Sequence, residues 1–219
     1  MKHLTLADEI VVLMLRDDTG EIRAECAKVA NISIAAGILM ELSLLGRIDT
    51  DLTSLFIVDP TPADDDLLDP ALREIAAEPN RRPSAWWIER LGGQEPDLLS
   101  KVLERLVRAG ILRVENRRWF WVFTRRAYPQ KTGREEREAK ARLAYVIHGD
   151  DVPAPRDTLL LGLAESSGAL SSIFSHEEVR KTANRIAQVV ALEEIGRSVG
   201  AVASDVREAL AAIASARFW

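Results

Sequence analysis

The segment that most constrains this fold is a short apolar run bracketed by arginine pairs. Residues 117–126 read Arg-Arg-Trp-Phe-Trp-Val-Phe-Thr-Arg-Arg. A helix that crosses a bilayer needs about 20 apolar residues, so this run is too short to span a membrane. As one strand it would be apolar on both faces, because successive side chains point to opposite sides. The protein's own core can cover one face, and the other face needs a second apolar partner.

The bulk composition predicts one folded domain with a local basic patch. The chain has 219 residues, of which 47% are hydrophobic and 29% charged, values typical of a soluble globular protein. We expect a single domain over residues 1–219. The net charge of −5 argues against a protein whose whole surface binds polyanions. Between Arg113 and Arg137, however, eight basic residues stand against three glutamates, which predicts a basic patch.

Cysteine usage and the start of the chain favour the cytoplasm. Cys26 is the single cysteine, which excludes an internal disulfide and fits a reducing compartment. The first residues carry no signal-peptide pattern, and no apolar run is long enough to span a bilayer. Abundant alanine and the predominance of arginine over lysine indicate a bacterial protein. We therefore expect a cytoplasmic protein that associates with membranes only peripherally.

Apolar periodicity, caps and turn residues predict a mainly α-helical chain. The helices are expected near residues 5–16, 32–45, 66–77, 83–91, 97–109, 135–147, 158–166, 175–190 and 205–217. A strand pair is expected at residues 47–49 and 55–59. A hairpin is expected with strands at 111–115 and 119–123 and its turn at 116–118. The predicted fold class is thus a single-domain helical bundle with one β-hairpin and a second short strand pair.

The residues that usually carry catalysis are scattered. His3, His148 and His176 have no metal-ligand spacing. Asp64-Asp65-Asp66 precedes a helix, where acidic residues serve as caps and first-turn charges more often than as cation ligands. No phosphate-binding glycine loop and no paired nucleophile and base are present. We expect no enzyme activity, no metal and no cofactor.

Several ordered segments resemble the Golgi phosphoprotein 3 family, in its bacterial branch. The segments span nearly the whole chain in the family's order: residues 4–9 with the turn 17–20, residues 40–48, residues 60–62 with 67–72, residues 87–91 and residues 106–112. The resemblance implies a mostly helical domain with a protruding β-hairpin. It also implies a peripheral membrane adaptor that binds phosphatidylinositol 4-phosphate.

The resemblance indicates which residues form the hairpin. It also indicates that the family's headgroup pocket is not retained in this chain. Counted from Gly110, the hairpin falls on Glu115 to Arg126, and in the family this hairpin contributes to self-association and membrane contact. The family's cationic and aromatic headgroup residues fall near Cys26, on Ala35, near Pro96 and on Leu99. None of these four residues is cationic or aromatic, so the pocket is not retained.

The favoured function is a peripheral protein that binds anionic phospholipid, self-associates and recruits membrane-protein cargo. Tryptophan suits the bilayer interface, and each arginine near an anionic surface adds about 1 kcal/mol. The residues expected at the membrane are Arg117, Arg118, Trp119, Phe120, Trp121, Arg125 and Arg126. Those expected to mediate oligomerisation are Glu115, Trp119, Phe120, Trp121, Val122 and Phe123.

Two alternatives remain open at this point. Helix 97–109 followed by the hairpin resembles a winged helix, with Arg117 and Arg118 at the wing tip contacting nucleic-acid phosphates. The acidic charge and the lack of base-reading Asn or Gln on that helix make nucleic acid the less favoured partner. In the second alternative, the aromatic residues are simply core, and the protein is a purely oligomeric interaction module.

Overall fold

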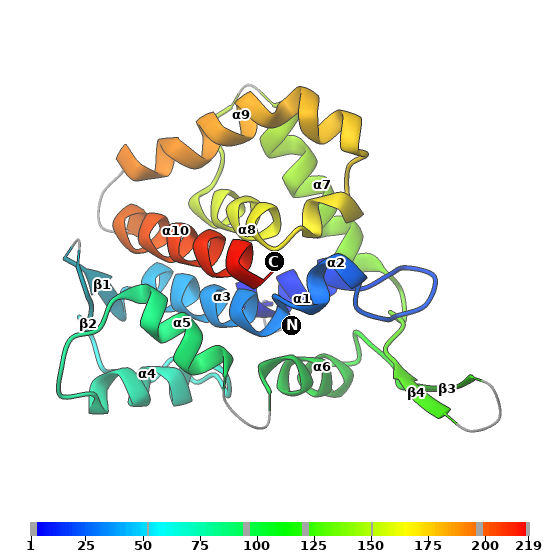
Figure 1. The fold of residues 1–219 in the computed structure, drawn as a ribbon, viewed down its shortest axis with the longest axis horizontal. Helices are drawn as coiled ribbons and strands as arrows, with labels where there is room; N and C mark the ends of the chain where they lie inside the picture. Colours follow the sequence, from blue (N-terminus) through cyan, green and yellow to red (C-terminus); the bar gives the residue numbers. More distant parts are fainter. Residues whose placement is uncertain are drawn as a thin grey trace.

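The computed structural model describes residues 4–217 except 52, 94–96, 120–122, 150 and 196–198. Within these residues the protein contains ten α-helices, one 3-10 helix and two antiparallel two-stranded sheets (Figure 1). The elements are α1 (Leu6–Met14), α2 (Ala24–Ala27), α3 (Ala30–Leu44), β1 (Ile48–Thr50), β2 (Leu55–Ile57), α4 (Leu68–Ala77), α5 (Ser84–Gly92), α6 (Leu98–Arg108), β3 (Glu115–Trp119), β4 (Phe123–Ala127), α7 (Arg134–His148), α8 (Pro155–Ser166), η1 (Ala169–Ser172), α9 (His176–Ile195) and α10 (Val199–Arg217).

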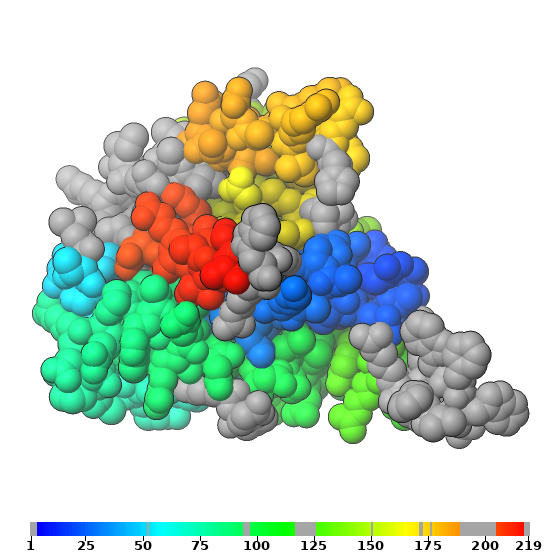
Figure 2. All heavy atoms as spheres, in the orientation of Figure 1, coloured from blue at the N-terminus to red at the C-terminus, as the bar shows by residue number. Residues whose placement is uncertain are grey.

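Helix α3 is the centre of the core. It is apolar nearly all round, and thirteen of its residues are buried. Such a helix is stable only when other elements cover every face. Helices α1, α5, α8 and α10 pack against it, and Figure 2 shows α10 lying between α5 and α9 on one face of the molecule. At Gly37 an added Cβ would lie 3.1 Å from the Ala7 backbone nitrogen, so glycine lets α1 and α3 approach closely.

The start of α1 is capped both locally and from a distant helix. The Thr5 side chain accepts a hydrogen bond from the Asp8 backbone N–H, and Asp8 accepts from the Thr5 backbone N–H at 2.9 Å. This reciprocal arrangement is a capping box. Glu41 of α3 accepts from the Leu6 backbone N–H at 2.8 Å. The backbone N–H groups of Thr5 and Leu6 therefore bind carboxylates, which also complement the helix dipole, and that of Asp8 binds the Thr5 hydroxyl.

Buried ion pairs tie α1 to later helices. Arg105 of α6 donates to Asp8 at 2.9 Å and to Asp65 at 2.7 Å. Arg142 and Arg156 likewise pair with Glu9. Because these carboxylates are buried, each needs a cation beside it to offset the loss of hydration.

The fold class predicted from sequence is confirmed, with corrections to individual elements. The strand pair at residues 48–57 and most of the helices lie where the pattern places them. The short helix α2 was missed, because a four-residue helix leaves no periodic signal. The predicted hairpin strands 111–115 and 119–123 were wrong. The strands are Glu115–Trp119 and Phe123–Ala127, so Asn116, Arg117 and Arg118 belong to β3 rather than to the turn.

Candidate functional site

The β3–β4 hairpin extends away from the helical body (Figure 1). Its two strands contact chiefly each other. The register pairs Glu115 with Ala127 at one end and Trp119 with Phe123 at the other. The idea that residues 117–123 form one continuous strand is therefore also wrong, because the apolar run crosses from β3 into β4. Its middle residues, Phe120, Trp121 and Val122, lie outside the described residues.

The base of the hairpin is anchored to the turn that follows α1. The Tyr128 backbone N–H donates to the Gly20 carbonyl at 2.8 Å, and the Arg113 N–H donates to the Pro129 carbonyl at 3.0 Å. Gly20 has a φ of +66°, and a Cβ there would lie 2.2 Å from the Pro129 nitrogen. Only glycine fits a left-handed position with so close a neighbour. The base of the hairpin is therefore packed tightly against this turn.

A groove of about 480 Å³ lies between α6 and the base of the hairpin. We call it the hairpin groove. It is lined by Glu104, Val107, Arg108, Val114, Asn116, Arg126 and Tyr128. Val114 is 49% exposed and lines the groove together with Arg108 and Arg126. The groove thus combines an apolar floor with a basic rim.

The arginines at this site differ in how they are engaged. Arg108 pairs with Asp66 at 2.9 Å, yet its side chain is 69% exposed. Arg113 pairs with Glu115 at 2.9 Å. Arg126 is exposed, and among the described residues no ion pair uses it. Arg126 is therefore the cation of this groove best placed to meet an anionic ligand.

The structure gathers the predicted site residues into one hairpin. Glu115, Arg117, Arg118 and Trp119 lie on β3, and Phe123, Arg125 and Arg126 lie on β4. The register places Arg117 opposite Arg125 and Asn116 opposite Arg126. The exposure of the expected aromatic side chains at residues 119–123 lies outside what the structure describes.

The acidic triplet and Arg105 serve the fold. Asp65 accepts from the backbone N–H groups of Leu67 and Leu68 at 2.9 and 3.2 Å, as expected for a helix cap. Burial raises the pKa of Asp65, but hydrogen bonds from Arg105 and from these backbone groups outweigh burial and bring the pKa to about 2. Arg105 is only 13% exposed, so it is not free to contact a phosphate on a bound partner.

The positions that correspond to the family's headgroup pocket are apolar or internally satisfied. Cys26 and Ala35 are fully buried, and burial raises the pKa of the Cys26 thiol to about 12. The Leu99 backbone N–H donates to the Asn31 side chain at 2.9 Å. Pro96 lies outside the described residues. At the described positions nothing replaces the missing cations.

Sequence reasoning missed the groove itself. Val107, Val114 and Tyr128 carry no motif. They converge because the two chain segments at the base of the hairpin pair with each other beside the end of α6, where the Ile111 backbone N–H donates to the Leu106 carbonyl at 3.0 Å. One signal was available: the last turn of α6 carries Arg105 and Arg108, and of these Arg108 lines the groove.

The model of the Golgi phosphoprotein 3 (GPP34) family matches residues 6–213, nearly the whole chain. Within the described part of the chain, no helix is both long enough and apolar enough to cross a membrane.

Proposed function

The chain belongs to the Golgi phosphoprotein 3 family, and from this membership we propose that it is a peripheral membrane protein that binds anionic phospholipid. The family is known for phosphoinositide binding. We propose that here the hairpin and the hairpin groove take over the contact with the headgroup, because the inherited pocket positions carry no cation.

The observation that carries the proposal is the cross-strand placement of arginines. Arg117 stands opposite Arg125 on an antiparallel ladder. Like charges directly opposite each other destabilise a sheet. A pair of this kind becomes favourable when an anion lies against it, and a phosphate accepts hydrogen bonds from two guanidinium groups well. Arg126 pairs with Asn116 and so belongs to the other face of the hairpin, where it lines the groove together with Val114.

The energies indicate that one hairpin alone binds weakly. Four arginines near an anionic surface add about 4 kcal/mol before salt screening. That corresponds to a dissociation constant of about 1 mM. Stable residence on a membrane needs inserted aromatic residues or several hairpins acting together. We therefore propose that Trp119, Phe120 and Trp121 enter the interface and that the protein self-associates beside this hairpin.

The same surface supports an adaptor role and a preference for lipid over nucleic acid. We propose that the protein acts as an adaptor in the cytoplasm and performs no catalysis. A lipid surface is favoured over nucleic acid because Arg105, the most buried arginine of α6, is held by Asp8 and Asp65. A winged-helix reader needs the cations of that helix to be free for phosphate.

Vesicle co-sedimentation tests the proposal. The double variant Arg117→Ala/Arg125→Ala is expected to lower partitioning onto phosphatidylserine vesicles about thirtyfold at low salt, because two arginines at about 1 kcal/mol each are removed. The matched control is Arg73→Ala/Arg180→Ala, since both of these arginines are exposed and lie on α4 and α9. Equal binding by the two double variants would overturn the proposal.

The aromatic tip needs a separate variant. Trp119→Ala/Trp121→Ala is expected to release the protein from the same vesicles while leaving the thermal unfolding temperature nearly unchanged. A large fall in unfolding temperature with vesicle binding retained would place these tryptophans in the core instead. Adding phosphatidylinositol 4-phosphate to neutral vesicles then shows whether that headgroup is preferred over phosphatidylserine.

A further inference from the structure

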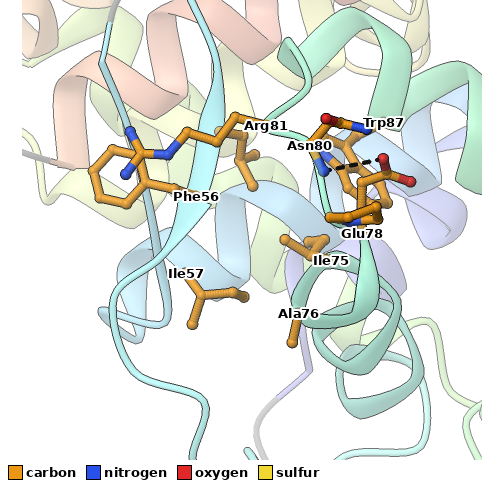
Figure 3. A pocket seen from close by; sticks show the side chains of 10 residues that line it. Phe56, Ile57, Ile75, Ala76, Glu78, Asn80, Arg81 and Trp87 are labelled. Carbon is orange, nitrogen blue, oxygen red and sulfur yellow. Dashed lines mark hydrogen bonds between the residues drawn. The ribbon is translucent and has the colours of Figure 1, made fainter.

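A gap beside β2 lies on the side of the molecule away from the hairpin (Figure 1). The Leu55 backbone N–H donates to the Arg82 carbonyl at 2.9 Å, and this single bridge joins β2 to the segment that leads into α5. Continued antiparallel pairing would bring Ile57 opposite Asn80. Instead, the Asn80 N–H donates to the Glu78 carboxylate at 3.3 Å. A cavity of about 160 Å³ therefore opens between β2, residues 78–81 and the end of α4 (Figure 3).

The backbone of Ile57 is turned toward this gap. In an antiparallel pair, residues that bond to the partner strand alternate with residues that point away from it. The Val58 N–H donates to the Arg47 carbonyl at 2.9 Å, so Val58 faces the β1 side, whereas Leu55 bonds on the opposite side. Ile57 shares the alternation of Leu55. Among the described residues, no backbone hydrogen bond outside the β1–β2 ladder uses its N–H or its carbonyl. The edge of β2 thus offers one backbone donor and one acceptor.

The side chain of Ile57 lies on the inner face of this small sheet. It shares that face with Leu55 and with its own partner Ile48, both of which are 2% exposed. A residue that paired with Ile57 along the open edge would project its side chain on the same face. The cavity lies there, and Figure 3 shows Ile75 and Ala76 across from Ile57. A cavity of about 150 Å³ with apolar walls holds one benzene molecule, so this one has room for a leucine side chain.

The other face of β2 holds the neighbouring segment in place. The Arg81 side chain crosses β2 and stacks on the Phe56 ring, with 4.5 Å between the guanidinium carbon and the ring centre (Figure 3). The Asp51 carboxylate accepts from the same guanidinium group at 2.6 Å. These contacts and the bridge at Arg82 fix the segment next to β2. The two segments separate just beside them, at the level of Ile57.

We propose that the open edge of β2 at Ile57 binds an extended segment of a partner protein, which adds one antiparallel strand and inserts one apolar side chain into the cavity. Peptides that add to a sheet edge gain affinity from main-chain hydrogen bonds and specificity from a side-chain pocket. A helix uses its backbone groups internally, so it leaves the donor and the acceptor of Ile57 unpaired. A small apolar molecule does the same. The site is separate from the hairpin and does not rest on lipid binding.

Titration with the blocked pentapeptide Thr-Thr-Leu-Thr-Thr, followed by the Ile57 amide resonance in a nitrogen–proton correlation spectrum, tests the proposal. Threonine favours an extended chain, and the leucine is the residue expected opposite Ile57. The Ile57 resonance is expected to shift in a saturable way. Replacing the leucine by serine is expected to weaken binding about tenfold, because the cavity loses its apolar occupant. No saturable shift up to the solubility limit of the peptide, or equal binding of the serine peptide, would overturn the proposal.

N-methylated peptides test the strand pairing itself. A methyl group on the leucine nitrogen removes the N–H that bonds to the Ile57 carbonyl, and is expected to weaken binding about tenfold. The matched control carries its methyl group on the nitrogen of the next threonine, whose N–H points away from β2 in an antiparallel pair. This control is expected to bind nearly as well as the unmodified peptide. Equal weakening by the two methyl groups would contradict strand addition.

Two alanines at the end of α4 provide matched protein variants. Ala76 and Ala77 are both exposed, and of the two only Ala76 lines the cavity. Ala76→Leu is expected to fill the cavity and to lower the affinity for the leucine peptide about tenfold, whereas Ala77→Leu is expected to leave it unchanged. Neither variant is expected to lower the thermal unfolding temperature. Unchanged affinity in Ala76→Leu would show that the cavity does not receive the leucine.

A dilution series without peptide tests a different occupant. If the Ile57 resonance shifts with protein concentration alone, a second copy of the chain occupies this edge, and the assignment to a partner segment is wrong. An Ile57 resonance that is independent of protein concentration and shifts with the leucine peptide supports the proposal.

Discussion

Gly20 and Gly46 share a left-handed backbone but differ in their surroundings. Their φ angles are +66° and +65°. At Gly46, which ends α3, an added Cβ would meet nothing within 4 Å. At Gly20 the Cβ would lie 2.2 Å from the Pro129 nitrogen, at the base of the hairpin. Gly46 is therefore required by the backbone angle alone, and Gly20 by both the angle and the space.

These two glycines provide a matched pair of substitutions. Gly46→Ala is expected to lower the free energy of unfolding by about 1 kcal/mol, the cost of a left-handed alanine. Gly20→Ala adds a backbone clash and is expected to cost about 2–4 kcal/mol. Urea unfolding of both variants measures the difference. Equal losses would mean that the loop after α1 moves away from Pro129 without cost.

Neighbouring residues also show what local pattern can and cannot decide. The pair Trp86-Trp87 lies on one helix, where adjacent side chains point about 100° apart, so the sequence predicts that one is buried and one is closer to the surface. The structure confirms this and identifies Trp87 as the buried residue. That choice depends on where α3 and α10 lie, since α5 packs against both, and no local pattern contains their positions.

At the scale of elements, α6 is held in place by an arginine whose partners are remote in sequence. Arg105 reaches Asp8, 97 residues away, and Asp65, 40 residues away. Asp8 is completely buried. One turn further along, Arg108 pairs with Asp66 at the surface. The same helix therefore carries one buried and one exposed arginine–aspartate ion pair, one turn apart.

Substitution of these two arginines is expected to give very different results. Arg105→Ala leaves Asp8 and Asp65 without their cation and is expected to cost about 3–5 kcal/mol. Arg108→Ala removes an exposed pair and is expected to cost less than about 1 kcal/mol. Chemical denaturation of both variants checks this expectation. A loss below about 1 kcal/mol for Arg105→Ala would show that the buried carboxylates take up protons or water instead.

At the scale of the whole molecule, the buried carboxylates respond to pH in opposite directions. Burial raises the pKa of Asp8, against the effect of Arg105, and burial raises the pKa of Glu9, against Arg142 and Arg156. Both groups bind protons more readily in the folded state, so their contribution to stability falls as pH rises through the raised pKa. The pKa of Asp65 is lowered from 3.8 to about 2, so its contribution is complete above 3.8 and is lost as pH falls.

The acid limb of the stability profile is therefore expected to depend on Asp65. Between pH 3.8 and about 2 the free energy of unfolding of the wild type should fall as Asp65 takes up its proton. The variant Asp65→Asn is expected to be less stable at neutral pH and to show a shallower slope in this interval. Denaturation at a series of pH values measures both slopes. Identical slopes would assign acid sensitivity to other carboxylates.

The sequence by itself determined the helical class, the capping box at Thr5, the glycine that ends α3 and the existence of a hairpin between Gly110 and α7. Each of these features depends on residues within a few positions of one another, so local spacing is enough to predict them. Residue patterning did not determine the register of the hairpin, because an apolar run has no internal register until Glu115 pairs with Ala127 in the folded structure. Tertiary structure alone also formed the hairpin groove, since no local pattern gives how the end of α6 packs beside the base of the hairpin.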